Sequence, residues 1–384
     1  MTEEFQPLTF PPEVLARISP ELSLQRHLAI GVRPNLRTFN EFRDITTTSG
    51  GLSRYNGDSV RGDSSVLGSS VLRSGGTMVV CTISGGIIEE DLPAEVINED
   101  AAAVNAVFAK EVESEIESKQ ARLDAYTSVY PVVEVERGRV GAPTDEEMIL
   151  SQKLYETILH SGMISKDALK VNVGLRSIDT DGSEHIYYRS QDNTDDDESS
   201  LDLGPKRAWS YVLYAKIKVF SRSGPLFDLV WASVVAALKN TNLPRAYIDE
   251  NAAGIKIPIK IRGNFGSIRE QYQITCDAVK KDKLVLNEDA IGFASNFGII
   301  DIDQEAAATV DDFEEKMDVD TRSVLLADLE GEEEELTAKK TVDVTLGQSG
   351  KELKSLTVVG GVSKSELKQA IKLARQRSEQ LQNK

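Results

Sequence analysis

The chain has 384 residues, of which 40% are apolar and 28% are charged, so it can bury a sizeable core and is not a disordered chain. Its length is typical of two or three domains. No apolar run approaches the ~18 residues of a membrane span, and the acidic start MTEEF lacks the basic and apolar parts of a signal peptide. We therefore expect a soluble, intracellular protein with no membrane partner.

The formal net charge of −18 argues against a nucleic-acid partner, because an acidic surface repels phosphates. The acidic residues are concentrated, however, in the runs 191–200, 311–320 and 330–336, which are poor in aromatic residues and in regular apolar spacing. Such runs are typical of solvated loops. The rest of the chain is closer to neutral, so a role with nucleic acid stays open.

Possible metal ligands are few and scattered. Cys81 and Cys276 lie far apart, outside CxxC spacing, and only His27, His160 and His185 could join them. Buried free thiols are the simpler interpretation of the two cysteines. We therefore expect no metal site, and we expect no cofactor.

Strand and helix signals alternate along the first half of the chain. Ser74-Gly75-Gly76 separates two β-branched arms, which indicates a β-hairpin. The segment 91–125 is rich in Ala, Glu and Lys and predicts a helical surface insertion, and 128–140 predicts another strand. Thr144 and Glu147 then form a capping box. The helix that follows has its apolar face at Leu150, Leu154 and Ile158.

The second half continues in the same way. A strand is expected over 207–220, and Pro225 is expected at the first position of the next helix. Ser363 and Glu366 should cap a terminal helix. The apolar faces of these two helices are Leu226, Val230, Val234 and Leu238, and Leu367, Ile371 and Ala374. This order of elements predicts an α+β fold in two layers.

The junction between the predicted strand and helix at 220–238 raises a functional question. A glycine at such a turn often lets the backbone close on a phosphate, helped by the partial positive charge of the helix N-terminus. Here the turn also carries Arg222 and Leu226, where a phosphate-using enzyme needs other groups.

Four segments have the order and spacing of the ribonuclease PH family. They are GVRPNLRTFNEFRDI (31–45), GSSVLRSGGTMVVCTISGGI (68–87), YPVVEVERGR (130–139) and SGPLFDLVWASVVAALKNTNLPRA (223–246). More narrowly, FPPEVLARISPELSLQRHLAIGVRPNLR and ERGRVGAPTDEEMILSQKL resemble the non-catalytic ring subunits of the eukaryotic RNA exosome. The resemblance covers about residues 30–300.

The resemblance implies a ribonuclease PH fold, built of ribosomal-protein-like β-α-β layers with acidic loop insertions. It divides the chain into an N-terminal extension (1–30), a first part (31–250) and a C-terminal part (251–384). Within these parts we expect insertions near 91–125 and 190–205 and an acidic loop near 303–340.

The junction departs from the pattern of active family members, which resemble one another in a strand ending in Asp followed by Gly-Gly-Thr-Arg. The corresponding positions here are Arg222, Ser223, Gly224, Pro225 and Leu226. Proline removes a backbone donor, leucine removes a guanidinium, and arginine inverts the charge where a metal ion would be held. The resemblance therefore implies a degenerate active site and no catalytic residue.

The resemblance also suggests where RNA and neighbouring subunits lie. Arg137 and Arg139, two residues apart at a strand end, either contact the RNA backbone or form surface or inter-subunit ion pairs. Arg33 and Arg37 match the family's opening arginines and are further RNA candidates, although Asn35-Leu36 replaces the family's Asp-Gly. Arg222 and Arg245 are expected at a subunit interface, with RNA contact as the alternative for Arg222.

The function implied by the resemblance is that of a catalytically inactive subunit of the exosome ring, which supports 3′ to 5′ RNA processing and decay. Its expected partners are other ribonuclease PH-like ring subunits, RNA-binding cap subunits, the threaded RNA and separate hydrolytic nucleases. Its expected location is the nucleus, the nucleolus and the cytoplasm. Two alternatives stay open: a phosphorolytic 3′ to 5′ exoribonuclease, and an acidic binding protein that uses its loops.

Overall fold

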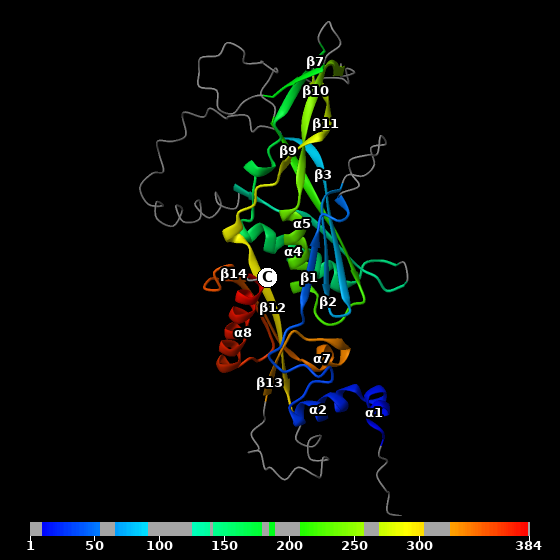
Figure 1. Cartoon of the computed structure of the whole chain (residues 1–384), viewed down its shortest axis with the longest axis vertical. Coiled ribbons are helices and arrows are strands. Elements are labelled where there is room, and N and C mark those ends of the chain that lie inside the picture. Colours follow the sequence, from blue (N-terminus) through cyan, green and yellow to red (C-terminus); the bar gives the residue numbers. More distant parts are fainter. Residues whose placement is uncertain are drawn as a thin grey trace, which may run out of the picture.

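Figure 1 shows a computed structural model of the whole chain, an elongated molecule in which three larger β-sheets follow one another along the long axis. The structure describes residues 10–53, 66–90, 125–138, 141–178, 184–188, 208–256, 269–302 and 323–382. Helices and sheets are mixed, and the predicted α+β class is confirmed.

A five-stranded sheet forms the middle of the molecule. Its strands, in spatial order, are β1 (Ile45–Ser49), β2 (Val66–Ser74), β3 (Thr77–Glu90), β9 (Ala208–Phe220) and β5 (Tyr130–Val135). Ser74 pairs with Thr77 at the end of the β2–β3 hairpin, which confirms the hairpin prediction. β9 runs antiparallel to β3 and parallel to β5.

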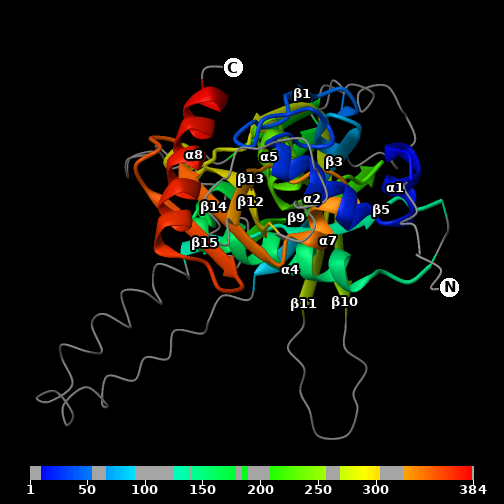
Figure 2. The same cartoon turned by 90° about the horizontal axis from the view of Figure 1, so that it is seen from below.

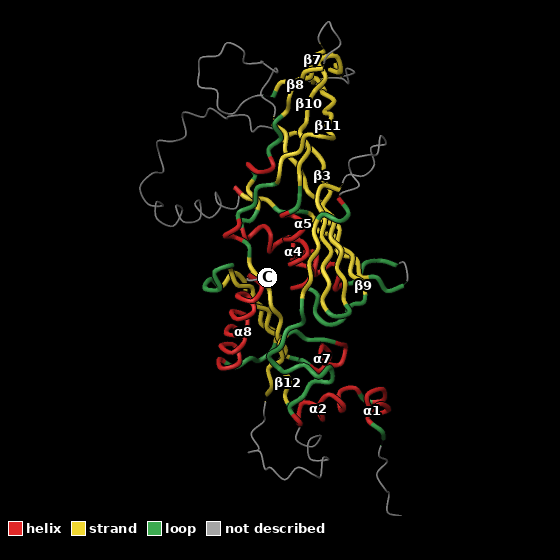
Figure 3. The backbone as a smooth tube through the Cα atoms, in the orientation of Figure 1, coloured by secondary structure: helices red, strands yellow, loops and turns green. Residues whose placement is uncertain are grey.

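Two helices, α4 (Asp145–Ser161) and α5 (Phe227–Lys239), lie on the same side of this sheet (Figure 3). α4 begins with the predicted capping box, in which the Thr144 N–H donates to Glu147 Oε2 at 2.6 Å. α5 begins two residues after Pro225, because Leu226 takes the N-cap position. The prediction of Pro225 at the first helical position is therefore wrong by two residues.

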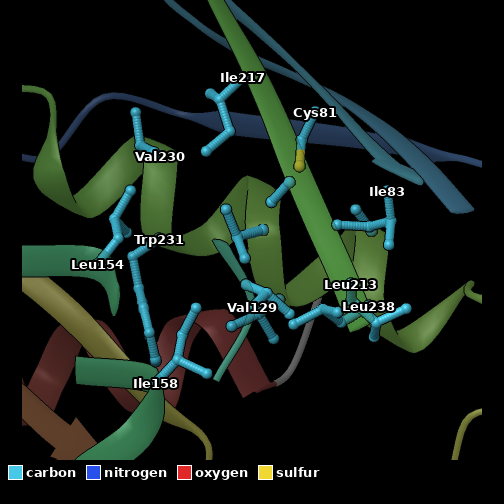
Figure 4. Close-up of a cluster of buried hydrophobic side chains, with 14 of the residues drawn as sticks. Cys81, Ile83, Val129, Leu154, Ile158, Leu213, Ile217, Val230, Trp231 and Leu238 are labelled. Atoms are coloured by element: carbon cyan, nitrogen blue, oxygen red, sulfur yellow. The ribbon is translucent and has the colours of Figure 1, made fainter. Parts of the chain in front are cut away.

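The core between the sheet and these helices is apolar and closed. In Figure 4, Trp231 of α5 and Leu154 of α4 lie among side chains of the strands, such as Ile217. Each fully buried side chain of this size contributes about 1.5–3 kcal/mol of hydrophobic stabilisation. The predicted apolar stripes of both helices are confirmed, since all seven residues are buried: Leu150, Leu154, Ile158, Leu226, Val230, Val234 and Leu238.

A second sheet carries the C-terminal helix. Its strands are β13 (Ser323–Ala327), β12 (Gly292–Asp301), β14 (Lys340–Gly347) and β15 (Leu353–Val359), and α8 (Lys364–Gln382) packs on one face. The predicted cap of α8 is present, because the Ser363 N–H donates to Glu366 Oε2 at 2.7 Å. Ala374 is buried, and Leu367 and Ile371 are partly buried.

A third sheet has the order β11 (Arg269–Lys283), β10 (Asn242–Lys256), β7 (Val173–Ile178) and β8 (Glu184–Tyr187). Smaller elements are β4 (Tyr126–Thr127), β6 (Ile164–Ser165) and the 3₁₀ turns η2 (Asp167–Leu169) and η3 (Glu288–Ala290). The expected boundary after residue 250 falls inside β10, which pairs with β11 on both sides of it. That boundary therefore does not separate two structural units.

The N-terminal helices α1 (Pro12–Ile18) and α2 (Pro20–Ile30) lie near α7 (Gly331–Thr337) at the lower end of the molecule in Figure 1, and Figure 2 views the three helices from that end. Leu24 and Leu28 of α2 are buried against Leu326 of β13. Among the helices described, none is long and apolar enough to cross a membrane.

The structure corrects the expected acidic loop near 303–340. Its later part forms β13, α7 and the start of β14, and the run 330–336 is almost entirely α7, with Glu334 buried. This helix is ordered by arginines from distant parts of the chain. Residues 303–322 and the insertions expected at 91–125 and 190–205 lie outside the described residues, apart from Ala125.

Candidate functional site

Gly224 lets another segment of the chain pack directly on the junction between β9 and α5. Its φ angle is +81°, and a Cβ built on it would lie 2.1 Å from the carbonyl oxygen of Leu329. Any side chain here would clash with backbone, so the close approach requires glycine. Residues around Leu329 therefore cover the turn at which the family resemblance would have a phosphate bind.

Arg222 is held by two carboxylates of its own chain. Its Nε donates to Glu146 Oε1 at 2.9 Å, and its two terminal nitrogens donate to the Glu335 carboxylate at 3.0 and 2.7 Å. Burial lowers the pKa of Arg222, but the hydrogen bonds to Glu335 and Glu146 outweigh it, and the net pKa is raised. The charge of Arg222 is thus balanced by carboxylates of α4 and α7.

Arg43 ties the junction to the segment after β13. Its Nε and one terminal nitrogen donate to Asp328 at 2.9 and 2.6 Å, and the other donates to the Ser223 carbonyl at 3.1 Å. Burial alone would raise the pKa of Asp328, yet the hydrogen bonds and charge of Arg43 lower it. This bidentate pair is the geometry that arginine and a carboxylate favour.

Asp228 is the carboxyl group of the first turn of α5. Its Oδ1 accepts the Leu229 N–H at 2.9 Å, and its Oδ2 accepts the Asn296 side-chain amide at 2.8 Å. Part of the residue is accessible to solvent, but the carboxyl group itself lies among protein atoms. That burial, followed by the negative charge of Asp328, raises its pKa to about 7.

A cleft of about 450 Å³ lies beside Pro225 and Leu226 at the start of α5. Its charged lining consists of Glu146, Asp228, Glu335, Asp343 and Lys153. Lys153 is itself paired with Asp343 at 2.7 Å. Arg222 pairs with Glu146 and Glu335, as Lys153 does with Asp343, so the described lining offers inorganic phosphate no unpaired cation.

The structure contradicts one of the predicted RNA contacts. Arg33 is fully buried, and its guanidinium donates to Glu334 and to the carbonyl oxygens of Ala327 and Asp328. It therefore cannot touch RNA, and its function is to hold α7 against the segment after β13. Arg37 pairs with Asp328 at 3.2 Å and with Glu330 at 2.9 Å, and only 12% of its side chain is exposed, so its RNA contact stays a prediction.

The other predicted arginines are more exposed. Arg137 is 32% exposed and pairs with Glu146 at 3.4 Å, whereas Arg139 lies outside the described residues. Arg245 is 42% exposed, pairs with Asp282 at 2.8 Å and lies 5.4 Å from the ring centre of Tyr188. Their contacts with RNA or with neighbouring subunits stay predictions, as does the interface role of Arg222.

Sequence reasoning missed the residues that fill the site from other elements. Glu335 was assigned to a solvated loop, and neither Asp328 nor Asn296 carried a local signal. The Asn296 amide oxygen accepts the Leu329 N–H at 3.0 Å and so fixes the segment that covers Gly224. In the part of the chain that the structure describes, no group of three or more His, Cys, Asp or Glu side chains could hold a metal ion.

Comparison with known proteins gives one family match: residues 41–244 match the 3′ exoribonuclease family, domain 1, of RNase PH. A curated relative, exosome complex component rrp43 of Schizosaccharomyces pombe, is 26% identical over 246 residues, which is 64% of this chain. The match spans 65% of that relative's length. It agrees with the sequence resemblance, which at its narrowest is to the subunit known in yeast as ribosomal RNA processing protein forty-three.

Two solved structures share the fold. The exosome of Archaeoglobus fulgidus with RNA bound to the active site matches with a TM-score of 0.51 and 13% identity, over 96% of this chain and 98% of that chain. An archaeal exosome core matches with a TM-score of 0.50 and 14% identity, over 97% and 98%. The predicted ribonuclease PH fold is confirmed.

Proposed function

Because the chain belongs to the 3′ exoribonuclease family of RNase PH, we propose that it is a subunit of an exosome ring and does not itself degrade RNA. The exosome part of this proposal is supported by the fission yeast relative and by the archaeal exosome chains, which it matches over nearly their whole length.

The proposal that the chain does not degrade RNA rests on the residues that line the cleft at the start of α5. Phosphorolysis needs inorganic phosphate held beside the last RNA linkage, by cationic or N–H donors, and an acid or metal ion for the leaving oxygen. The one lysine that lines this cleft is paired with Asp343, and the Asp228 carboxyl group already accepts an N–H at the start of α5. Arg222, the nearby cation, is held by Glu146 and Glu335.

The exposed face of the five-stranded sheet supports a role in assembly. Tyr130 is 50% exposed, Val132 53% and Tyr214 49%, on strands β5 and β9, whose alternate residues are buried against the helices. The rings of Tyr130 and Tyr214 lie 5.7 Å apart, and Lys216, paired with Glu134, lies opposite Val132 on the same face. Such a surface is typical of protein interfaces, and other ribonuclease PH-like subunits are its proposed partners.

The further partners in this proposal are the RNA that the ring encloses, RNA-binding cap subunits and hydrolytic nucleases that degrade the RNA. The function served is 3′ to 5′ RNA processing and decay, including maturation of ribosomal RNA and turnover of messenger RNA. The proposed locations are the nucleus, the nucleolus and the cytoplasm.

The proposed lack of phosphorolytic activity is tested by incubating the purified chain with single-stranded RNA and labelled inorganic phosphate, with a phosphorolytic family member as the positive control. We expect no labelled nucleoside diphosphate from this chain. Phosphate-dependent release that Arg222→Glu abolishes would show instead that the chain is a phosphorolytic exoribonuclease.

A further inference from the structure

The C-terminal helix α8 has two unlike faces. Ala370 and Ala374 are buried against the second sheet, and Arg377 is buried against the segment before β1, where it donates to the Arg43 carbonyl at 2.9 Å. In Figures 1 and 2 the helix lies at the outside of the molecule, so its other face points away from the body. The apolar side of α8 is therefore already used in the fold, and only the polar side is available to a partner.

The available side carries a row of cations, which we call the α8 stripe: Lys364, Lys368, Lys372 and Arg375, all exposed. Their spacing of four, four and three residues places them within about 80° of arc on the helix, over a length of about 16 Å. Glu379, one turn after Arg375, is also exposed on this side, so the stripe ends in one negative charge.

The charges of the α8 stripe are not used within the described chain. No ion pair there involves its four members, whereas Arg222, Arg245 and Lys340 are each paired with a carboxylate. Glu366, the acidic residue of the first turn, is directed to Ser323 and Ser363 instead. Arg375 makes one hydrogen bond, from its Nε to the Gly350 carbonyl at 3.0 Å.

That hydrogen bond brings a further cation to the end of the α8 stripe. A Cβ on Gly350 would lie 3.4 Å from Cγ of Arg375, so the turn at Gly350 touches the helix. Lys351 follows directly, is exposed, and within the described residues it has no ion pair. Two separate parts of the chain thus place unpaired positive charge in one region of a protein whose formal net charge is −18.

We propose that the α8 stripe binds the phosphate backbone of single-stranded RNA, without sequence preference. This inference rests on the proposed function, which supplies RNA as the ligand. Lysine binds phosphate as a point charge, and backbone contacts position RNA without reading its bases. The side chains between the cations, Ser365, Gln369 and Gln376, are polar. Lysine is depleted at protein interfaces, and the apolar residues Ala370, Ala374, Leu367 and Leu373 of α8 pack in the core of the second sheet and not within the stripe.

The test is the salt dependence of binding of a labelled uridine decamer to the full chain, measured by fluorescence anisotropy. For single strands the slope of log affinity against log salt is about −0.7 for each phosphate neutralised. Four contacts therefore give a slope of about −2.8, or about 50-fold weaker binding at 200 mM than at 50 mM salt. Lys368→Gln with Lys372→Gln should halve the slope, which leaves about a 7-fold effect.

The matched control is Lys216→Gln with Lys218→Gln on β9, which removes the same charge from two exposed lysines that pair with Glu134. We expect its slope to equal that of the unmodified chain, and circular dichroism checks that both variants fold. Equal slopes for the unmodified chain and the α8 variant would overturn the inference, and so would an equal loss in the control.

Failure of the proposed RNA contact can be distinguished from failure of the proposed exosome assembly. If the chain fails to co-purify with ring subunits but the α8 variant lowers the slope, the assembly proposal is wrong and the RNA contact stands. If the chain assembles and the slope does not change, only the RNA contact is wrong. Capture of an acidic protein by α8 with no change in RNA binding would also overturn it.

Discussion

Replacing the buried Gly224 by alanine should destabilise the chain more than the same change at an exposed turn with a similar backbone angle. A left-handed conformation costs a non-glycine residue about 1–2 kcal/mol. At Gly224 the new methyl group would also lie 2.1 Å from the Leu329 carbonyl oxygen, so the covering segment must move. Overpacking of this kind costs about 1–3 kcal/mol more. We therefore expect a total loss of about 2–5 kcal/mol.

Gly31 provides the matched control. It has a φ angle of +89°, close to that of Gly224, but nothing lies within 4 Å of a Cβ built on it. Gly31→Ala should therefore show the conformational cost alone, about 1–2 kcal/mol. The measurement is urea unfolding of both variants, followed by tryptophan fluorescence, with Trp231 in the core as one reporter.

The difference between the two variants isolates the contact with Leu329. If both substitutions lower the free energy of unfolding by the same amount, within about 0.5 kcal/mol, the segment after β13 does not cover the junction as described. The explanation of how the turn at Gly224 is closed would then be refuted.

Reversing the charge of Arg222 should cost about 1 kcal/mol in urea unfolding, since 27% of its side chain and 28% of that of Glu335 are exposed. Exchanging the charges of Arg222 and Glu335 should recover only part of this loss, because Glu146 would then face a second carboxylate. Burial raises the pKa of the Asp228 carboxyl group from 3.8 to about 7, so the folded state binds the proton of this group more tightly than the unfolded state does. The free energy of unfolding should therefore fall as the pH rises from about 4 to about 7. Asp228→Asn should flatten this decline across a pH series of unfolding curves, and an unchanged decline would count against the assignment. Burial raises the pKa of Cys81 to about 12, whereas Cys276 is exposed although its pKa is also raised. A thiol reagent at about pH 9 should therefore modify one cysteine of the native chain and both cysteines of the denatured chain. Modification of both cysteines in the native chain would show that Cys81 is not enclosed in the core.

The elements with strong local signals were predictable from the sequence. The hairpin at Ser74-Gly75-Gly76 and the capping box of Thr144 and Glu147 each depend on residues a few positions apart, and both are present. The apolar stripe of α5 was also predictable, because a period of 3.6 residues fixes which side chains meet the sheet. The exact start of α5 was not, since it depends on how the turn at Gly224 is covered.

The contacts that close the site could not be predicted, because they join distant parts of the sequence. Arg33 meets Glu334 across 301 residues, and Arg43 meets Asp328 across 285. The acidic run 330–336 has the composition of a solvated loop, and only the arginines that face it explain why it forms α7. The same contacts explain why Arg33, which matches an RNA-binding position in the family resemblance, is buried here.

The central claim, membership of an exosome ring, is tested most directly by native mass spectrometry of the full chain purified under mild conditions from cells that express it. The account predicts a hetero-oligomer in which this chain and other ribonuclease PH-like chains are present in equal amounts. A chain recovered as a monomer, with a cooperative melt that no ribonuclease PH-like partner alters, would contradict it.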